Sequence, residues 1–150
     1  MEQKLLISRI LTGIVVLILS VPDIRKRSIP VWGLAGFVIP VSVYIGINLF
    51  GNKEPVFMLF QSVIGTIPGI ALLVMGKLTG KIGSADGVVL AAMGFIEGIM
   101  GALCVLCLGC FLLSVPSIVL LIMKKIKKDT GMAFIPFLGV GHLIWIFALS

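Results

Sequence analysis

The stretch that decides the fold is GVVLAAMGFIEGIMGALCVLCLGCFLLSVPSIVLLIM, residues 87–123, in which Glu97 is the one charged residue. As a single helix this stretch would be roughly 55 Å long, well beyond the hydrocarbon core of a bilayer, which is about 30 Å thick. We therefore expect it to fold back once around Glu97, Gly98 and Gly101, where a charge and two flexible residues coincide. The stretch thus predicts two membrane spans, the first of them short.

The rest of the chain has the same apolar character. Hydrophobic residues make up 59% of the 150 residues and charged residues 12%, a balance far from that of soluble domains. Further apolar runs cover about 4–22, 31–50, 56–76 and 132–149. Because one span needs roughly 20 apolar residues, the sequence predicts an all-α, polytopic membrane helical bundle with about six transmembrane helices. We expect residues 1–150 to form a single integral-membrane domain.

The basic residues predict the orientation of this bundle. With six spans, the loops at 23–30, 77–86 and 124–129 fall on one side, and they hold nine of the twelve Lys and Arg residues. Such residues concentrate in cytoplasmic loops, so we expect these loops in the cytoplasm and both termini outside. Arg9 is expected to extend outward from its helix end. Topology and anionic membrane lipids explain the net charge of +6, and no nucleic acid partner is needed.

The six carboxylates fall into two groups. Asp23 follows the first apolar run and Asp86 opens the fourth, so each lies where a cytoplasmic loop meets a helix end. We expect these two aspartates at the same membrane depth. The other four are expected in solvated segments or at the outer turn: Glu2, Glu54, Asp129 and Glu97.

An ionisable residue at the membrane edge of a bundle usually faces an interior or a wet cavity and marks a functional site. Two close aspartates cannot both ionise easily, so they share a proton. One can then act as general base for a water while the other polarises a scissile carbonyl, which is aspartic protease chemistry. From spacing alone, an equally good interpretation is that Asp23 and Asp86 each cap a helix or pair with a nearby Lys or Arg.

The segment GSADG, residues 83–87, adds geometry to the second aspartate. We expect Ser84 to be the N-cap of the following helix, with Asp86 in its first turn. Gly83 and Gly87 are expected to form a small-xxx-small pair that lets another helix approach closely.

Three motifs together resemble the type IV prepilin peptidases, the GxGD-type intramembrane aspartyl proteases of bacteria and archaea. The first runs from Asp23 through Arg25 to Pro30 in DIRKRSIP, and the second is Gly83-Ser84-Ala85-Asp86 at the start of a later span. The third is MAFIPFLGVGHLI at 132–144, which contains Pro136. The resemblance covers essentially the whole chain as the six-helix peptidase core of that family.

This resemblance implies an activity and a substrate. Asp23 and Asp86 would be the catalytic pair of an aspartic endopeptidase that uses no metal and no cofactor. Its partners would be prepilin or pilin-like precursors, whose short basic leader ends in Gly and is cut at the cytoplasmic face of the prokaryotic inner membrane. Larger family members also methylate the new N-terminus through an added cytoplasmic segment with cysteine pairs. The loop at 23–30 is too short to hold that segment, so the chain resembles the small form.

One position departs from the family pattern, because Ala85 stands where the family has the glycine before the second aspartate. A left-handed backbone at this position would be strained by alanine, whereas a helical backbone would accept it.

A different class of function stays open from the sequence. In a small membrane transporter or secretion-assembly subunit, a carboxylate such as Asp86 or Glu97 would bind a proton or a cation, although such a group belongs near the bilayer midplane.

We interpret His142 as a hydrogen-bonding residue inside the bundle. The remaining candidates for metal ligands are expected to be small packing residues on an apolar span: Cys104, Cys107 and Cys110.

Overall fold

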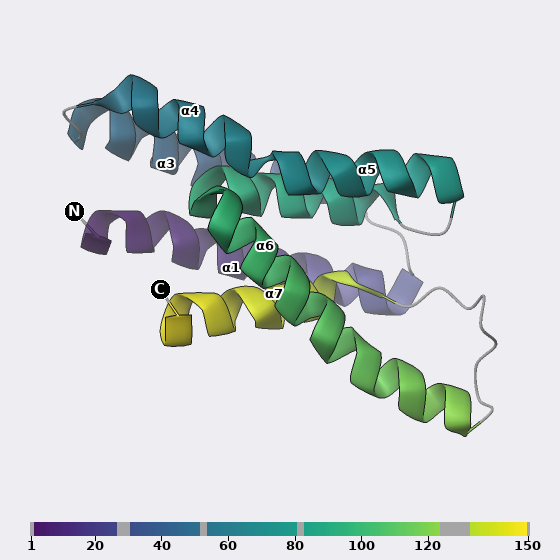
Figure 1. Ribbon diagram of the computed structural model, residues 1–150. Coiled ribbons are helices and arrows are strands. Elements are labelled where there is room, and N and C mark those ends of the chain that lie inside the picture. Colours follow the sequence, from purple (N-terminus) through teal and green to yellow (C-terminus); the bar gives the residue numbers. More distant parts are fainter. Residues whose placement is uncertain (1, 27–30, 52–53, 81–82, 124–132, 150) are drawn as a thin grey trace.

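The structure, a computed structural model, describes residues 2–26, 31–51, 54–80, 83–123 and 133–149 (Figure 1). All regular structure in these ranges is helical, which confirms the predicted all-α class. The elements in chain order are α1 (Glu2–Lys26), α2 (Val31–Ala35), α3 (Val38–Gly51), α4 (Pro55–Gly65), α5 (Ile67–Thr79), α6 (Ser84–Ile122), α7 (Ile135–Ile144) and the π-helical turn η1 (Trp145–Leu149).

Several of these helices are long and apolar enough to cross a membrane. Each exposes large apolar side chains, such as Ile18 on α1, Phe60 on α4 and Ile118 on α6, as expected of helices that face lipid rather than water. The chain is therefore a multi-pass membrane protein. The candidate spans are Leu6–Arg25, Trp32–Phe50, Pro55–Thr79 and Ser84–Ile122, beside a shorter apolar segment, Ile135–Phe147.

Helix α6 contains the predicted reversal. Gly98 has φ 74° and ψ 179° in the middle of its 39 residues, a backbone conformation essentially restricted to glycine. Figure 1 shows the chain turning back at this point. We call the part of α6 before Gly98 its first arm, which runs beside α5, and the part after Gly98 its second arm, which crosses α7. The expected fold-back around Glu97, Gly98 and Gly101 is therefore confirmed, while the total of six spans stays a prediction.

Two apolar runs that the sequence predicts as continuous are divided. The run at 31–50 forms α2 and α3, and the run at 56–76 forms α4 and α5, which meet at Thr66. Pro68 lies in the first turn of α5, where its missing N–H is not needed. Helix α5 nevertheless continues the direction of α4 in Figure 1, so the two serve as one candidate span.

Glycines let the first arm of α6 lie very close to α4 and α5. A Cβ atom added to Gly69 would lie 2.6 Å from the Cβ of Ala91, and one added to Gly65 would lie 2.9 Å from the Cα of Gly98. Neither side chain could be accommodated without a shift. This contact between small residues is the usual way in which membrane helices approach one another.

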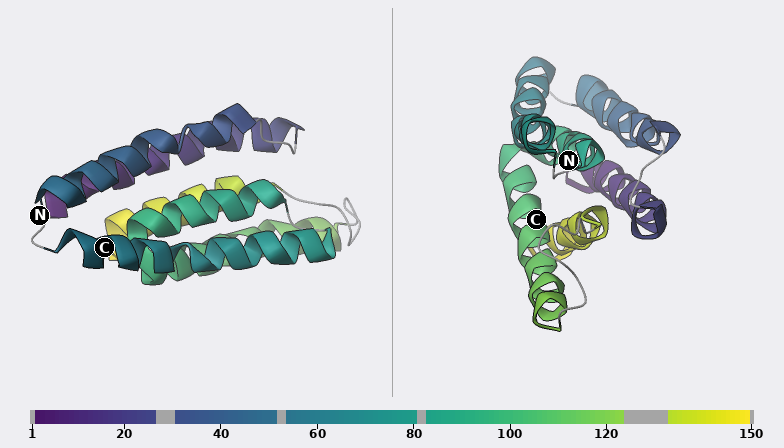
Figure 2. Two further views of the ribbon diagram at one scale, coloured as in Figure 1. Left: turned by 90° about the horizontal axis from the view of Figure 1, so that it is seen from above. Right: turned by 90° about the vertical axis from the view of Figure 1, so that its right-hand side faces the viewer.

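Helix α7 packs against both α1 and the second arm of α6, as the two views of Figure 2 show. The buried core joins these helices through Val16 and Leu19 of α1, Val105 of α6 and Leu138 of α7. As a result, the C-terminal end of α1 and the N-terminal ends of α6 and α7 lie together at one end of the bundle (Figure 1). The functional residues predicted from the sequence lie at that end.

Candidate active site

Asp23 lies near the end of α1 and is 7% exposed. Its Oδ2 atom accepts a hydrogen bond of 3.2 Å from the backbone N–H of Ile135, the first residue of α7. The first N–H groups of a helix have no partner inside it, and the next residue, Pro136, has no N–H at all. The Asp23 carboxylate thus caps α7 from a helix more than a hundred residues away in the chain.

Asp86 lies in the first turn of α6, and its carboxylate forms a hydrogen bond with the backbone of Gly83. Gly83 is the N-cap residue, with φ −65° and ψ 131°. This is one half of a capping box, in which the third helical residue reaches back to the N-cap N–H. The prediction that Ser84 is the N-cap is wrong, because the helix begins one residue earlier and Ser84 is its exposed first residue.

The structure brings the two aspartates together. The carboxylates of Asp86 and Asp23 are close enough for their charges to interact, although the residues belong to helices that are far apart in the sequence. Each carboxylate also caps a helix N-terminus, as the second of the two interpretations left open by spacing predicted. The arrangement is a partly buried pair of carboxylates, each held by a backbone N–H, and its catalytic role stays a prediction.

The residues around Asp86 have separate roles. Ala85 lies inside the helical first turn of α6, so the helical alternative applies and alanine is accepted there. Gly87 packs on α5, where an added Cβ would lie 2.6 Å from the Cγ of Leu73. The predicted pairing of Gly87 with Gly83 is wrong, because Gly83 is exposed and an added Cβ there would meet only the carboxylate of Asp86.

The other motif residues are placed as follows. Arg25 is exposed on α1, two residues after Asp23, and Pro136 is in the first turn of α7 beside Ile135. Pro30 and the basic loop at 124–129 lie outside the described residues. Within the described ranges, no group of three or more His, Cys, Asp or Glu side chains could hold a metal ion.

A second polar group, at the other end of the first arm of α6, differs from expectation. Glu97 lies at the turn as predicted, directly before Gly98. Its side chain, however, is fully buried there, and its Oε2 atom lies 3.1 Å from Nε of Arg9. Trp145 donates a 2.9 Å hydrogen bond to the same oxygen, and Nε2 of His142 lies 3.2 Å from the carbonyl oxygen of Arg9. Arg9 therefore points inward to a partner, and not outward as predicted, because a buried carboxylate needs a neutralising charge. We call Arg9, Glu97, His142 and Trp145 the Glu97 cluster.

One sequence signal could have revealed the Glu97 cluster. Arg9 and Glu97 are the charged residues placed well inside apolar runs, and they have opposite signs. Membrane proteins pair such residues across helices.

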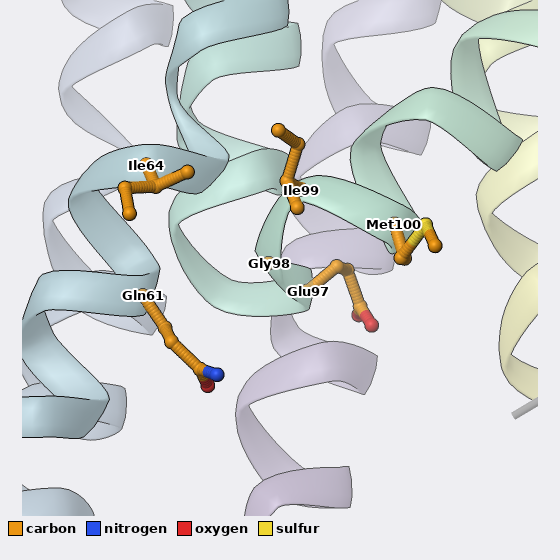
Figure 3. A pocket seen from close by; sticks show the side chains of 6 residues that line it. All are labelled: Gln61, Ile64, Glu97, Gly98, Ile99 and Met100. Carbon is orange, nitrogen blue, oxygen red and sulfur yellow. The ribbon is translucent and has the colours of Figure 1, made fainter.

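A pocket of about 330 Å³ opens beside this second group (Figure 3). It lies at the Gly98 turn and is lined by α4 and by the turn itself, with Gln61, Ile64, Ile99 and Met100 around it. The Glu97 carboxylate points away from Gln61 in this view. The pocket is at the far end of the first arm from Asp86, so it is not part of the aspartate site.

The fold and the site together define a class: an all-α multi-pass membrane protein with a partly buried pair of aspartates at one end of its bundle. No family model, no curated protein and no solved structure matches the chain. Its function must therefore be inferred from its own residues.

Proposed function

We propose that the chain is an intramembrane aspartic endopeptidase that removes the leader peptide of type IV prepilin or pilin-like precursors. The observation that supports it is the proximity of Asp23 and Asp86, two carboxylates that helices distant in the sequence bring together. The resemblance in DIRKRSIP, GSAD and MAFIPFLGVGHLI supplies the substrate class. By the same inference, the site faces the cytoplasm of a prokaryotic cell.

The proposed chemistry needs one ionised and one protonated aspartate. The ionised carboxylate takes a proton from a water molecule as the water oxygen attacks the scissile carbonyl carbon, and the protonated carboxyl donates its proton to the carbonyl oxygen. The tetrahedral intermediate then collapses as the C–N bond breaks: the carboxyl that took the proton from water gives it to the leaving nitrogen, and the other carboxylate recovers its proton from a hydroxyl of the intermediate. Oδ2 of Asp23 is held by Ile135 N–H, which leaves Oδ1 for the water or the substrate.

The test is leader cleavage by the purified protein in detergent or liposomes, with pilin-like precursors from its own genome as substrates. We expect one cut directly after the leader glycine, and loss of cleavage in both Asp23→Asn and Asp86→Asn, because each removes half of a pair that acts as a unit. A bell-shaped pH–rate profile is expected between about pH 4 and 9, as for two coupled acids. Cleavage that persists in either variant at near wild-type rate would contradict the paired mechanism.

The alternative, a transporter or assembly subunit with a cation-binding carboxylate, has less support. Glu97 already has Arg9 as its counter-ion, so a bound cation would leave a net positive charge in a buried site. Asp86 lies in the first turn of a candidate span and not at its middle. Proton or cation flux in liposomes that depends on Glu97 and not on Asp23 would favour this alternative.

A further inference from the structure

The same three helices carry both polar groups of the bundle. Helix α1 carries Asp23 and Arg9, the first arm of α6 carries Asp86 and Glu97, and α7 supplies Ile135 at one end and His142 at the other. Asp86 and Glu97 are separated by close to three helical turns, or about 16 Å, and Arg9 and Asp23 by close to four turns, or about 21 Å. Each helix therefore presents both of its polar residues on nearly one face.

The close glycine contacts of the first arm, such as Gly69 with Ala91, set its position against α5. They do not set its position against α1, because the core that the two helices share is apolar, with Leu90 and Met93 on the first arm, and hydrophobic burial is not directional. A slip of one turn along α1 would move Asp86 by about 5.4 Å relative to Asp23. The aspartates would then no longer meet.

The Glu97 cluster is directional. Glu97 accepts from Trp145 and pairs with Arg9 through one oxygen, while the Arg9 carbonyl accepts from Nε2–H of His142, since a carbonyl can only accept. These contacts join α1, α6, α7 and η1 at one level of the bundle. Any slip would leave a buried charge without its partner, which is strongly unfavourable.

The cluster is better suited to selecting one arrangement than to adding stability. Oε1 of Glu97 and Nδ1 of His142 are buried without a hydrogen-bond partner, which lowers the free energy that the network contributes. Buried polar groups that contribute little stability can still select one register between helices.

We propose that the Glu97 cluster is a register clamp, which sets the axial position of the first arm of α6 against α1 and α7 and so holds Asp86 beside Asp23. Glu97 is then a positioning residue for the aspartate pair. The proposal rests on the proposed function only in treating that pair as catalytic.

The test measures register directly and needs no substrate. In a chain with the three native cysteines replaced by alanine, a cysteine at position 23 is combined with one at position 83, 86 or 90, and a short homobifunctional thiol reagent reports which pair reacts fastest. We expect position 86 to be preferred when the cluster is intact. In Glu97→Gln this preference over 83 and 90 should fall by about tenfold, since loss of one partner of a buried pair is worth at least that factor.

Two further variants separate register from folding. Arg9→Met combined with Glu97→Leu replaces the ion pair with apolar side chains, which usually preserves folding, and it should also lose the preference for position 86. Ser62→Ala removes the hydrogen bond between Ser62 and Tyr44, which joins α3 and α4 and neither aspartate, and it should keep the preference. An unchanged preference in the folded double variant would overturn the proposal, even if leader cleavage is established. A lost preference supports the clamp even if the chain proves not to be a peptidase.

Discussion

At the scale of single residues, Asp23 and Asp86 each have a place in the fold as well as in the proposed reaction. Asp23 completes the N-terminus of α7, and Asp86 completes the N-terminus of its own helix. A substitution at either position therefore affects both the stability of the protein and the proposed reaction. Comparing two different substitutions at one position separates the effect on stability from the effect on activity.

For Asp23 we predict that Asn and Ala differ in stability although both lack activity. Asn keeps a side-chain oxygen that can accept from Ile135 N–H, whereas Ala leaves that buried donor unpaired, which costs about 1–3 kcal/mol. The measurement is the free energy of unfolding of both variants in the same detergent. Arg25→Gln, an exposed change two residues away, is the control and should match the wild type. Equal stability of the Asn and Ala variants would show that the bond to Ile135 contributes nothing.

Ala85→Gly introduces the glycine that the prepilin peptidases, which the motif resembles, have at this position, and we predict no gain in activity. Because Ala85 is helical, glycine there should lower the free energy of unfolding by up to about 1 kcal/mol. Cleavage rate and unfolding are measured on the same preparation. A severalfold faster reaction would mean that the site needs the close approach or the flexibility of glycine.

At the scale of helices, the contact of α5 with the first arm of α6 depends on glycines, which have no side chain to keep the two helices apart. We predict that Gly87→Ala destabilises the protein by about 1–3 kcal/mol, as overpacking does, because its Cβ would lie 2.6 Å from Leu73 Cγ and 2.9 Å from the Gly69 carbonyl oxygen. Gly46→Ala on α3 is the matched control, since no atom lies within 4 Å of an added Cβ there. It should be neutral or stabilising. Equal effects of both substitutions on the unfolding midpoint would argue against a close helix contact at Gly87.

The Gly98 turn depends on backbone conformation and not on space. Nothing lies within 4 Å of an added Cβ at Gly98, yet its φ of 74° and ψ of 179° are essentially open to glycine alone. We predict that Gly98→Asn costs about 1–3 kcal/mol. Gly80→Asn is the control, because Gly80 has the left-handed φ 64° and ψ 7° of a helix C-cap, which asparagine adopts readily. A similar loss of stability in both variants would contradict this distinction.

At the scale of the whole molecule, the chain begins and ends at the same end of the bundle, opposite the aspartates (Figure 1). With the bias of basic residues, we predict that a reporter fused after Ser150 is extracytoplasmic and that one inserted at 124–129 is cytoplasmic. Paired reporters of opposite compartment specificity provide the measurement and its control. A cytoplasmic C-terminus would contradict the proposed location of cleavage.

Much of this architecture could be predicted from the sequence, because in a membrane charges and apolar length are strong constraints. The reversal near Gly98 follows from a run too long for one span, and the meeting of Asp23 and Asp86 follows from two carboxylates at equivalent helix ends. Glu97 could not be placed in the same way, since a charge at a turn is compatible with solvent as well as with a partner. Its partners are on α1 and η1, and only tertiary packing brings those together.

In the predicted topology, Gly98 also decides how many times the chain crosses the membrane. A chain that ran straight through this residue would make α6 one rod of about 58 Å, with one crossing fewer than the six that the sequence predicts. Everything beyond it would emerge in the opposite compartment, and Ile135 would begin its helix on the wrong side to meet Asp23. The positive φ of Gly98 thus determines whether α7 begins on the same side of the membrane as the end of α1, which is the condition for the bond between Ile135 and Asp23.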